Sequence, residues 1–204
     1  MDHQELKLPT DVPPSFGGLG TRPGKGLDDV PQIAREAGRI LGRFHQLAGG
    51  IPAEELEVPL PRFHDLAWRA GQLEQAVKEG LPDRLQPCGD LISLARDLIG
   101  YCRQIPLEKL PTRVCHNDPK LGNILFEKTT GKALCLIDLD TLMPGSLLYD
   151  FGDAARTLLS PVPESDTNPG KIEADLRMFE ALVAGLKESG CPLAGEERAW
   201  LPHG

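Results

Sequence analysis

Hydrophobic residues recur at intervals of three or four along several stretches of the chain, which is the spacing of one face of an α-helix. The first stretch begins after Asp28-Asp29, which can cap a helix, has Pro31 in its first turn, and ends at Gly49-Gly50. We interpret His45, near this face, as a packed core residue, because no second ligand stands one turn away. The apolar positions of the stretch are Ile33, Ala37, Ile40, Leu41, Phe44 and Leu47.

Three further stretches repeat this pattern and predict three more helices. The first of them ends at Gly80, the second begins near Asp90 as a possible N-cap, and the third ends at Gly190. The charged residues between the apolar positions are explained most simply as solvated faces, so we interpret these helices as scaffold. Their apolar positions are Leu66, Ala70, Leu73 and Val77; Leu91, Leu94, Ala95, Leu98 and Cys102; and Ile172, Leu176, Phe179, Val183 and Leu186.

The hydrophobic period changes after Pro111. The runs RVCH, NILFEK and KALCLIDL are short and rich in residues that favour strands, and Thr129-Thr130-Gly131 forms a turn between the last two. Residues 123–139 are therefore predicted to form a β-hairpin. The expected fold class is α+β and mostly helical, with one small hairpin.

The first 30 residues differ from the rest of the chain in composition. The run LPTDVPPSFGGLGTRPGKG is dense in proline and glycine, which disfavours regular structure. The glycines do not have the spacing of a Walker loop or of a dinucleotide-binding turn. We predict that residues 1–30 are an irregular segment and that residues 31–204 form one domain.

Overall composition narrows the class of protein. The 204 residues are 40% hydrophobic and 25% charged, with a net charge of −8, which argues against a nucleic acid or an anionic membrane as partner. The N-terminus lacks the pattern of a signal peptide, and no stretch is apolar for long enough to span a bilayer. Five cysteines without a C-x-x-C pair favour reduced thiols. We expect a cytoplasmic globular protein.

Two short segments place acidic and amide side chains at the outer ends of the hairpin. They are HNDPKLGN, residues 116–123, and LIDLD, residues 136–140. Because the hairpin reverses at Gly131, these ends approach each other. Mg²⁺ prefers carboxylate and amide oxygens as ligands. Asn123 and Asp138 are therefore predicted to bind one magnesium ion.

The remaining residues of these segments suit phosphoryl transfer from ATP. That reaction needs a carboxylate to accept the proton of the attacking hydroxyl, and a cation near the γ-phosphate. Asp118 is the predicted base, and Lys120 is the predicted phosphate contact. His116 is predicted to brace the loop through hydrogen bonds. For Asp140, magnesium binding and a turn-capping role are both open.

These motifs resemble those of a known superfamily. HNDPKLGN matches the H-x-D-x-x-x-x-N loop of the aminoglycoside phosphotransferases and choline kinases, and LIDLD matches their I-D-x-D/E metal motif. IDLDTLMPGSLLYDFGDAAR, residues 137–156, is similar to the corresponding run of N-acetylhexosamine 1-kinases, and LPRFHDLAWRAGQLEQAV, residues 60–77, also resembles those sugar kinases. The likeness covers roughly residues 31–190.

The resemblance implies a protein-kinase-like fold, ATP and Mg²⁺ as cofactors, and a small-molecule hydroxyl as acceptor. It suggests that the segment with Asp150 and Asp153 supports the catalytic loop, although acids also suit the start of a helix. Arg156 is a candidate substrate contact or a partner of an acid. The resemblance favours the anomeric hydroxyl of an N-acetylhexosamine. An amino alcohol, an aminoglycoside or homoserine are alternative acceptors.

Such a fold has two lobes, and the smaller N-terminal lobe holds the nucleotide. The sequence has no strand run with a central lysine before the first helix, and it ends at ERAWLPHG, where relatives continue. We therefore expect a C-terminal lobe that is itself truncated, with the N-lobe missing. An inactive lobe with a binding or regulatory role is the third hypothesis. The sequence does not indicate an oligomeric state.

Overall fold

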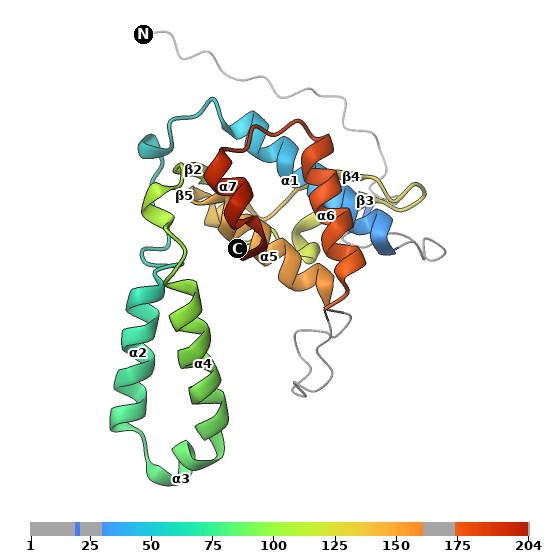
Figure 1. Ribbon diagram of the computed structural model, residues 1–204. Helices are drawn as coiled ribbons and strands as arrows, with labels where there is room; N and C mark the ends of the chain where they lie inside the picture. Colours follow the sequence, from blue (N-terminus) through green and yellow to red (C-terminus); the bar gives the residue numbers. More distant parts are fainter. Residues whose placement is uncertain (1–18, 21–29, 161–173, 204) are drawn as a thin grey trace.

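The computed structural model describes residues 19–20, 30–160 and 174–203 (Figure 1). The predicted α+β class is confirmed, because helices dominate and the strands form small antiparallel sheets. The helices are α1 (Val30–Ala48), α2 (Leu66–Glu79), α3 (Pro82–Leu85), α4 (Gly89–Cys102), α5 (Leu147–Leu159), α6 (Leu176–Glu188) and α7 (Gly195–Trp200). The strands are β1 (Leu19–Gly20), β2 (Arg113–Cys115), β3 (Ile124–Glu127), β4 (Ala133–Leu136) and β5 (Met143–Gly145).

The body of the fold is built on a close crossing of α1 and α6. A Cβ atom added to Gly38 would lie 2.0 Å from the carbonyl oxygen of Leu182, and one added to Gly185 would lie 1.8 Å from that of Arg35. Glycine at both positions therefore lets the two backbones touch. The buried core around this crossing includes Ala34, Ala37, Leu148, Phe151, Leu182 and Leu186.

The predicted hairpin is present. β3 and β4 pair in antiparallel fashion with Ile124 opposite Leu136, so the residues just beyond both strands leave the sheet at the same end. β2 pairs with β5, with Cys115 opposite Met143. The two-residue strand β1 pairs with β3, so the expectation of irregular structure before residue 30 is wrong for Leu19–Gly20.

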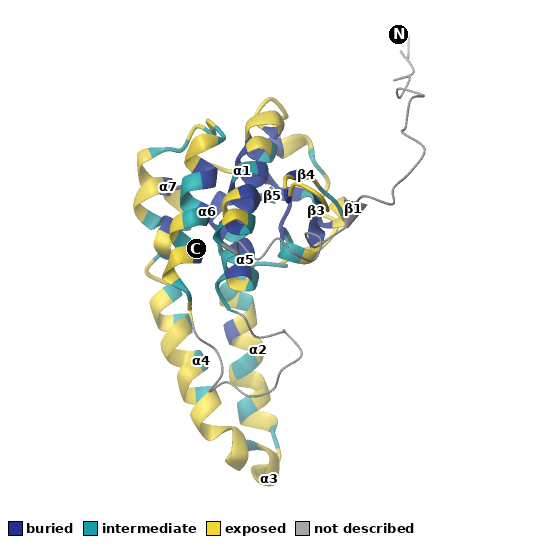
Figure 2. Cartoon of the chain, turned by 90° about the vertical axis from the view of Figure 1, so that its right-hand side faces the viewer, coloured by how far each residue is buried: buried dark blue, intermediate teal, exposed yellow. Residues whose placement is uncertain are grey.

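Helices α2, α3 and α4 form an arm that projects from the body (Figure 1). The predicted inner face of α2 is confirmed, with Ala70 buried. The predicted face of α4 is wrong in part: Ile92, Ala95 and Ile99 are half-buried, whereas Leu91, Leu94 and Leu98 are exposed. Figure 2 shows that most of α4 is exposed. The apolar surface of α4 is wider than its neighbour α2 covers. The N-cap of α4 is Cys88, and Asp90 lies in its first turn.

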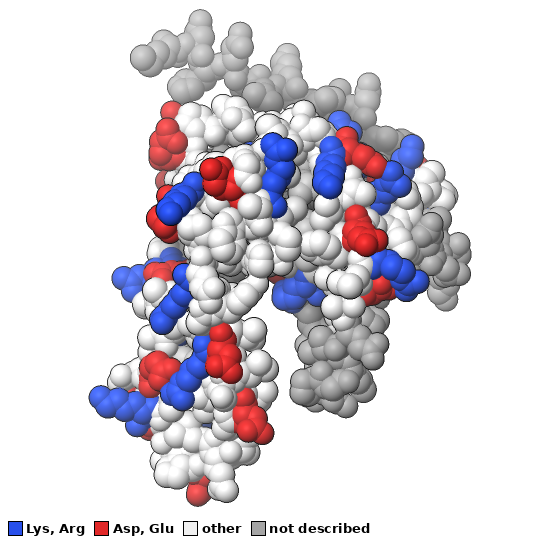
Figure 3. All heavy atoms as spheres, viewed as in Figure 1, with Lys and Arg blue, Asp and Glu red and all other residues white. Residues whose placement is uncertain are grey.

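Charged side chains of both signs are interspersed over the body and the arm on the face that Figure 3 shows. Within the described residues, no helix combines the length and the apolar character that a membrane crossing requires. The proposed cap Asp28-Asp29 and the apolar position Ile172 lie outside the described residues.

Candidate functional site

A buried carboxylate on α5 holds the loop that follows β2 in place. Asp150, in the first turn of α5, has no exposed surface. Its two oxygens accept hydrogen bonds from the backbone amides of His116, at 2.9 Å, and Asn117, at 2.7 Å. The Nε2 atom of His45 lies 3.0 Å from Oδ2 of the same carboxylate. Asp150 therefore contacts the backbone of the loop that carries Asp118 directly.

Asn117 gives this loop its shape. Its φ of 66° is in the left-handed region, which is uncommon for a residue other than glycine. The side-chain amide donates to the carbonyl oxygens of Cys115, Thr141 and Met143 at 3.1 to 3.2 Å. These contacts fasten the loop to the segment that enters β5, and together they stabilise the strained conformation.

His116 connects the loop to the hairpin. Its Nε2 atom lies 2.9 Å from the carbonyl oxygen of Ile137, and the Ile137 amide donates to the carbonyl oxygen of Asn123, also at 2.9 Å. Ile137 is therefore held on one side by the loop and on the other by the start of β3. The next residue, Asp138, has a φ of 68° and a ψ of 59°. These links bring the predicted magnesium-binding segments to one end of the hairpin.

Asp118, Lys120 and Asn123 are in direct contact. Lys120 Nζ lies 2.7 Å from Asp118 Oδ2. Asn123 Nδ2 donates to the backbone oxygen of Asp118 at 2.8 Å and to its Oδ2 at 3.0 Å. Because both partners of Nδ2 are acceptors, the orientation of the Asn123 amide is fixed and its Oδ1 atom faces away from them. Asn123 is buried, whereas Asp118 remains partly accessible.

Asp138 and Asp140 are both exposed, at the N-cap and within the short 3-10 turn Leu139–Thr141. A left-handed conformation at an aspartate costs about 1–3 kcal/mol and is common where a side chain must be aimed at a site. Asp138 therefore meets the structural expectation for a metal ligand more closely than Asp140 does.

Asp153 and Arg156 form an ion pair on α5. Arg156 donates to Asp153 Oδ1 from Nε at 3.0 Å and from Nη2 at 2.6 Å. Burial raises the pKa of the Asp153 carboxyl, and the negative charge of Asp118 adds to this rise, while Arg156 and Lys120 oppose it. The pairing of Arg156 with an acid, one of the two predicted alternatives, is thus observed. Asp153 is close enough to the loop to sense the charges of Asp118 and Lys120.

His45, Cys115 and Asp150 form a buried group whose ligand atoms lie within 4.8 Å of one another. Burial, with the charge of Asp150, raises the pKa of the Cys115 thiol well above its usual range. Both oxygens of Asp150 already accept the amides of His116 and Asn117, and the group offers three ligands where structural zinc sites use four. The group is therefore interpreted as a brace for the loop, and the prediction that His45 is a core residue is confirmed by its burial.

Sequence reasoning missed several residues that shape this site. Thr141 Oγ1 donates to the carbonyl oxygen of His116 at 2.6 Å, and Thr157 Oγ1 accepts from the amide of Leu121 at 3.0 Å. Like Asn117, these residues have short polar side chains with partners far away in the sequence. Among the buried supports of the loop, His45 could be noted from the sequence because it is a polar residue within an apolar helical face.

A pocket of about 310 Å³ lies beside the loop, between the base of the arm and the start of α5. His64 belongs to both features: it lines the pocket, and its Nε2 atom lies 3.2 Å from the carbonyl oxygen of Asn117. Its ring stacks on Tyr149, with centroids 4.5 Å apart. The described lining is mostly apolar and aromatic, and it includes Arg69 but no acidic residue.

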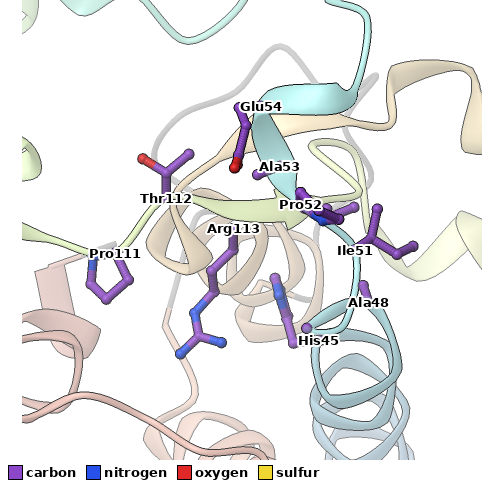
Figure 4. A pocket seen from close by; sticks show the side chains of 11 residues that line it. His45, Ala48, Ile51, Pro52, Ala53, Glu54, Pro111, Thr112 and Arg113 are labelled. Carbon is purple, nitrogen blue, oxygen red and sulfur yellow. The ribbon is translucent and has the colours of Figure 1, made fainter.

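A second cavity, of about 350 Å³, lies at the C-terminal end of α1 (Figure 4). Its lining includes His45, Glu54 and Arg113. The Arg113 guanidinium donates to both carboxylate oxygens of Glu197, at 2.6 and 2.7 Å, and the pKa of Arg113 is raised by these bonds. Arg113 is thus committed to an internal pair, and the described lining of this cavity includes none of the residues predicted for phosphoryl transfer.

The chain is similar to known proteins in sequence and in fold. A model of the APH family, described as "Phosphotransferase enzyme family", matches residues 17–186. Among solved structures, an aminoglycoside-3'-phosphotransferase of type VIII is similar, with a TM-score of 0.50 and 16% sequence identity. The match covers 92% of this chain and 64% of that one. At this identity the likeness concerns the fold.

Proposed function

Because the chain belongs to the phosphotransferase enzyme family, we propose that it takes part in transferring the γ-phosphoryl group of ATP to a hydroxyl of a small molecule. The observation that carries the proposal is the double link of Ile137 to His116 and Asn123. Those hydrogen bonds tie the segment with Asp138 to the loop with Asp118. Positioning and charge stabilisation supply most of the rate in such reactions, so a fixed arrangement of these groups suits the chemistry.

Asp118 is assigned as the base. Its carboxylate is partly accessible, and both Lys120 and Asn123 contact the Oδ2 atom. We assign Oδ1 to the proton of the acceptor hydroxyl. The ammonium of Lys120 lies against this carboxylate, and its position two residues from the base also suits a contact with the γ-phosphate.

Asn123 and Asp138 are assigned to Mg²⁺, with Asp140 as a possible third ligand. The donor set fits Mg²⁺. The orientation of the Asn123 side-chain amide leaves its Oδ1 atom for a cation, and Asp138 and Asp140 offer exposed carboxylates. When bound, the ion would neutralise phosphate charge. His116, Asp150 and Asp153 are assigned as supports of the loop.

The pocket beside the loop favours a sugar over a polycationic aminoglycoside. An aminoglycoside would be expected to bind acidic side chains, and none lines the described part of this pocket, whereas a quaternary amino alcohol also suits aromatic rings and is separated by the acceptor panel below. The apolar face of a pyranose suits a wall of aromatic rings such as Phe63, His64 and Tyr149. Together with the resemblance of residues 60–77 and 137–156 to sugar kinases, this lining makes an N-acetylhexosamine, phosphorylated at the anomeric hydroxyl, the proposed acceptor class.

The test is a panel of acceptors with radiolabelled ATP and Mg²⁺, comprising N-acetylhexosamines, an aminoglycoside, choline and homoserine. We expect transfer to a sugar, and a loss of about 10²–10⁴-fold in turnover for Asp118→Asn. Wild-type turnover in that variant would remove Asp118 from the role of base. Transfer to a cationic acceptor would replace the sugar. Absence of both transfer and Mg-ATP binding by calorimetry would favour a non-catalytic role for this chain.

A further inference from the structure

The arm carries an exposed row of large apolar side chains on α4. Leu91, Leu94, Leu98 and Tyr101 have exposed fractions of 59%, 53%, 54% and 47%. Their spacing of three, four and three residues is that of the a and d positions of a heptad. Scattered exposed leucines are ordinary, but a continuous row of this length on one helix face is typical of a contact surface.

The three leucines of this row do not lie on the face with which α4 packs in the structure, whereas Tyr101, at its end, contacts His203 of the C-terminal turn. Ile92, Ala95 and Ile99 form a separate half-buried row. Arg96 donates to Glu74 of α2 at 2.7 and 2.9 Å, which marks the side of α4 that turns toward α2. Because the arm projects from the body, the exposed row lies on an accessible element (Figures 1 and 2).

The exposed row has an acidic border. Asp90 and Asp97 are both exposed and stand seven residues apart, so they follow the row along its flank. A second copy of the chain, packed antiparallel across this face, would bring Asp97 near its own counterpart. Like charges at that position oppose such a dimer, and an anionic membrane surface is disfavoured in the same way.

We propose that this face of α4 docks an amphipathic helix of a partner protein, with apolar residues at heptad spacing and lysine or arginine along their flank. The three leucines would fill the holes between the partner's apolar residues, and the two aspartates would select a basic helix and set its register. The proposal uses no residue of the phosphotransfer site and does not depend on the proposed function.

The test uses two synthetic helical peptides of about three heptads, each with leucine at the a and d positions. One has lysine at the flanking positions, and the other has glutamate. Binding to the full chain is measured by fluorescence anisotropy, after sedimentation has shown that each peptide is monomeric. We expect the lysine peptide to bind at least about tenfold more tightly. Leu94→Glu or Leu98→Glu should weaken it by more than about tenfold.

Two variants separate the surface from general effects. Leu176→Glu changes an exposed leucine on α6, 70% accessible and outside the row, and should leave binding unchanged. Asp90→Asn with Asp97→Asn should reduce the preference for lysine while sparing the fold. Circular dichroism confirms folding of each variant.

Three results would overturn the proposal. They are equal binding of the two peptides, wild-type binding by both leucine variants, or a dimer of the chain alone that Leu94→Glu dissociates in light scattering. Binding to phosphatidylserine vesicles that requires Leu94 would reassign the surface to a membrane.

Discussion

The imidazole of His116 joins two separate segments of the site: its Nε2 atom lies 2.9 Å from the carbonyl oxygen of Ile137. Ile137 directly precedes Asp138, whose backbone is left-handed. The orientation of Asp138 therefore depends on a side chain that belongs to the opposite loop. His116 therefore stabilises the contact between the two segments.

We expect His116→Ala to lower the free energy of unfolding by about 1–3 kcal/mol, because the carbonyl of Ile137 loses its partner and a buried ring is removed. Urea unfolding followed by circular dichroism measures this change. Phosphoryl transfer should fall with it, since Asp138 is no longer held. An unchanged unfolding midpoint would show that the contact does not restrain the hairpin.

The amide of Asn123 provides a sharper test because Asn123→Asp changes few atoms. The new carboxylate would face the backbone oxygen and Oδ2 of Asp118, both of which are acceptors. We expect a loss of about 1–3 kcal/mol in the free energy of unfolding at neutral pH. Asp140→Asn, an exposed change in the same region, should stay within about 0.5 kcal/mol. Equal effects of the two variants would contradict the assigned orientation of the amide.

A glycine at the crossing of α1 and α6 and an open glycine on α2 should respond in opposite ways to substitution by alanine. Gly185→Ala would place a methyl group 1.8 Å from the carbonyl oxygen of Arg35, so we expect destabilisation of at least about 1–3 kcal/mol. Gly71→Ala on α2 meets no atom within 4 Å and should stabilise the helix by about 0.5–1 kcal/mol. Thermal melts of the two variants measure the contrast. Similar melting temperatures would mean that the helices can separate at no cost.

Asp153 predicts a pH dependence of stability. Burial raises the pKa of its carboxyl in the folded state above the ordinary value of an aspartate. Between the unfolded and folded pKa values the folded chain binds more protons, so the contribution of Asp153 to stability falls as pH rises through that window. The free energy of unfolding of wild type, relative to Asp153→Asn, should therefore decrease from acidic to neutral pH. Urea titrations at several pH values check the sign, and an increase would contradict it.

The hairpin end of the site could be predicted from the sequence because it depends on residues that are close together in the chain. The hairpin follows from two strand-like runs around Gly131, and its two outer ends necessarily leave the sheet together. That geometry was enough to predict that the segments with Asn123 and Asp138 would be neighbours. The assignment of these residues to magnesium stays a prediction.

The supports of the site could not be predicted in the same way. His45 and Asp150 are far apart in the sequence, and their approach depends on how α1 packs against α5. Asp150 was proposed through a family resemblance, while Asn117 and Thr141 carried no signal at all. On α4, helical periodicity identified the apolar residues but could not show that α2 covers one part of them.

The crossing of α1 and α6 also has a consequence for biosynthesis. The ribosome produces α1 early and α6 near the end of the chain, so the apolar face of α1 emerges long before its partner exists. At a synthesis rate of about 5–20 residues per second, that interval is on the order of ten seconds. During that interval the apolar face of α1 lacks its partner, so this part of the core is completed only after α6 has been synthesised.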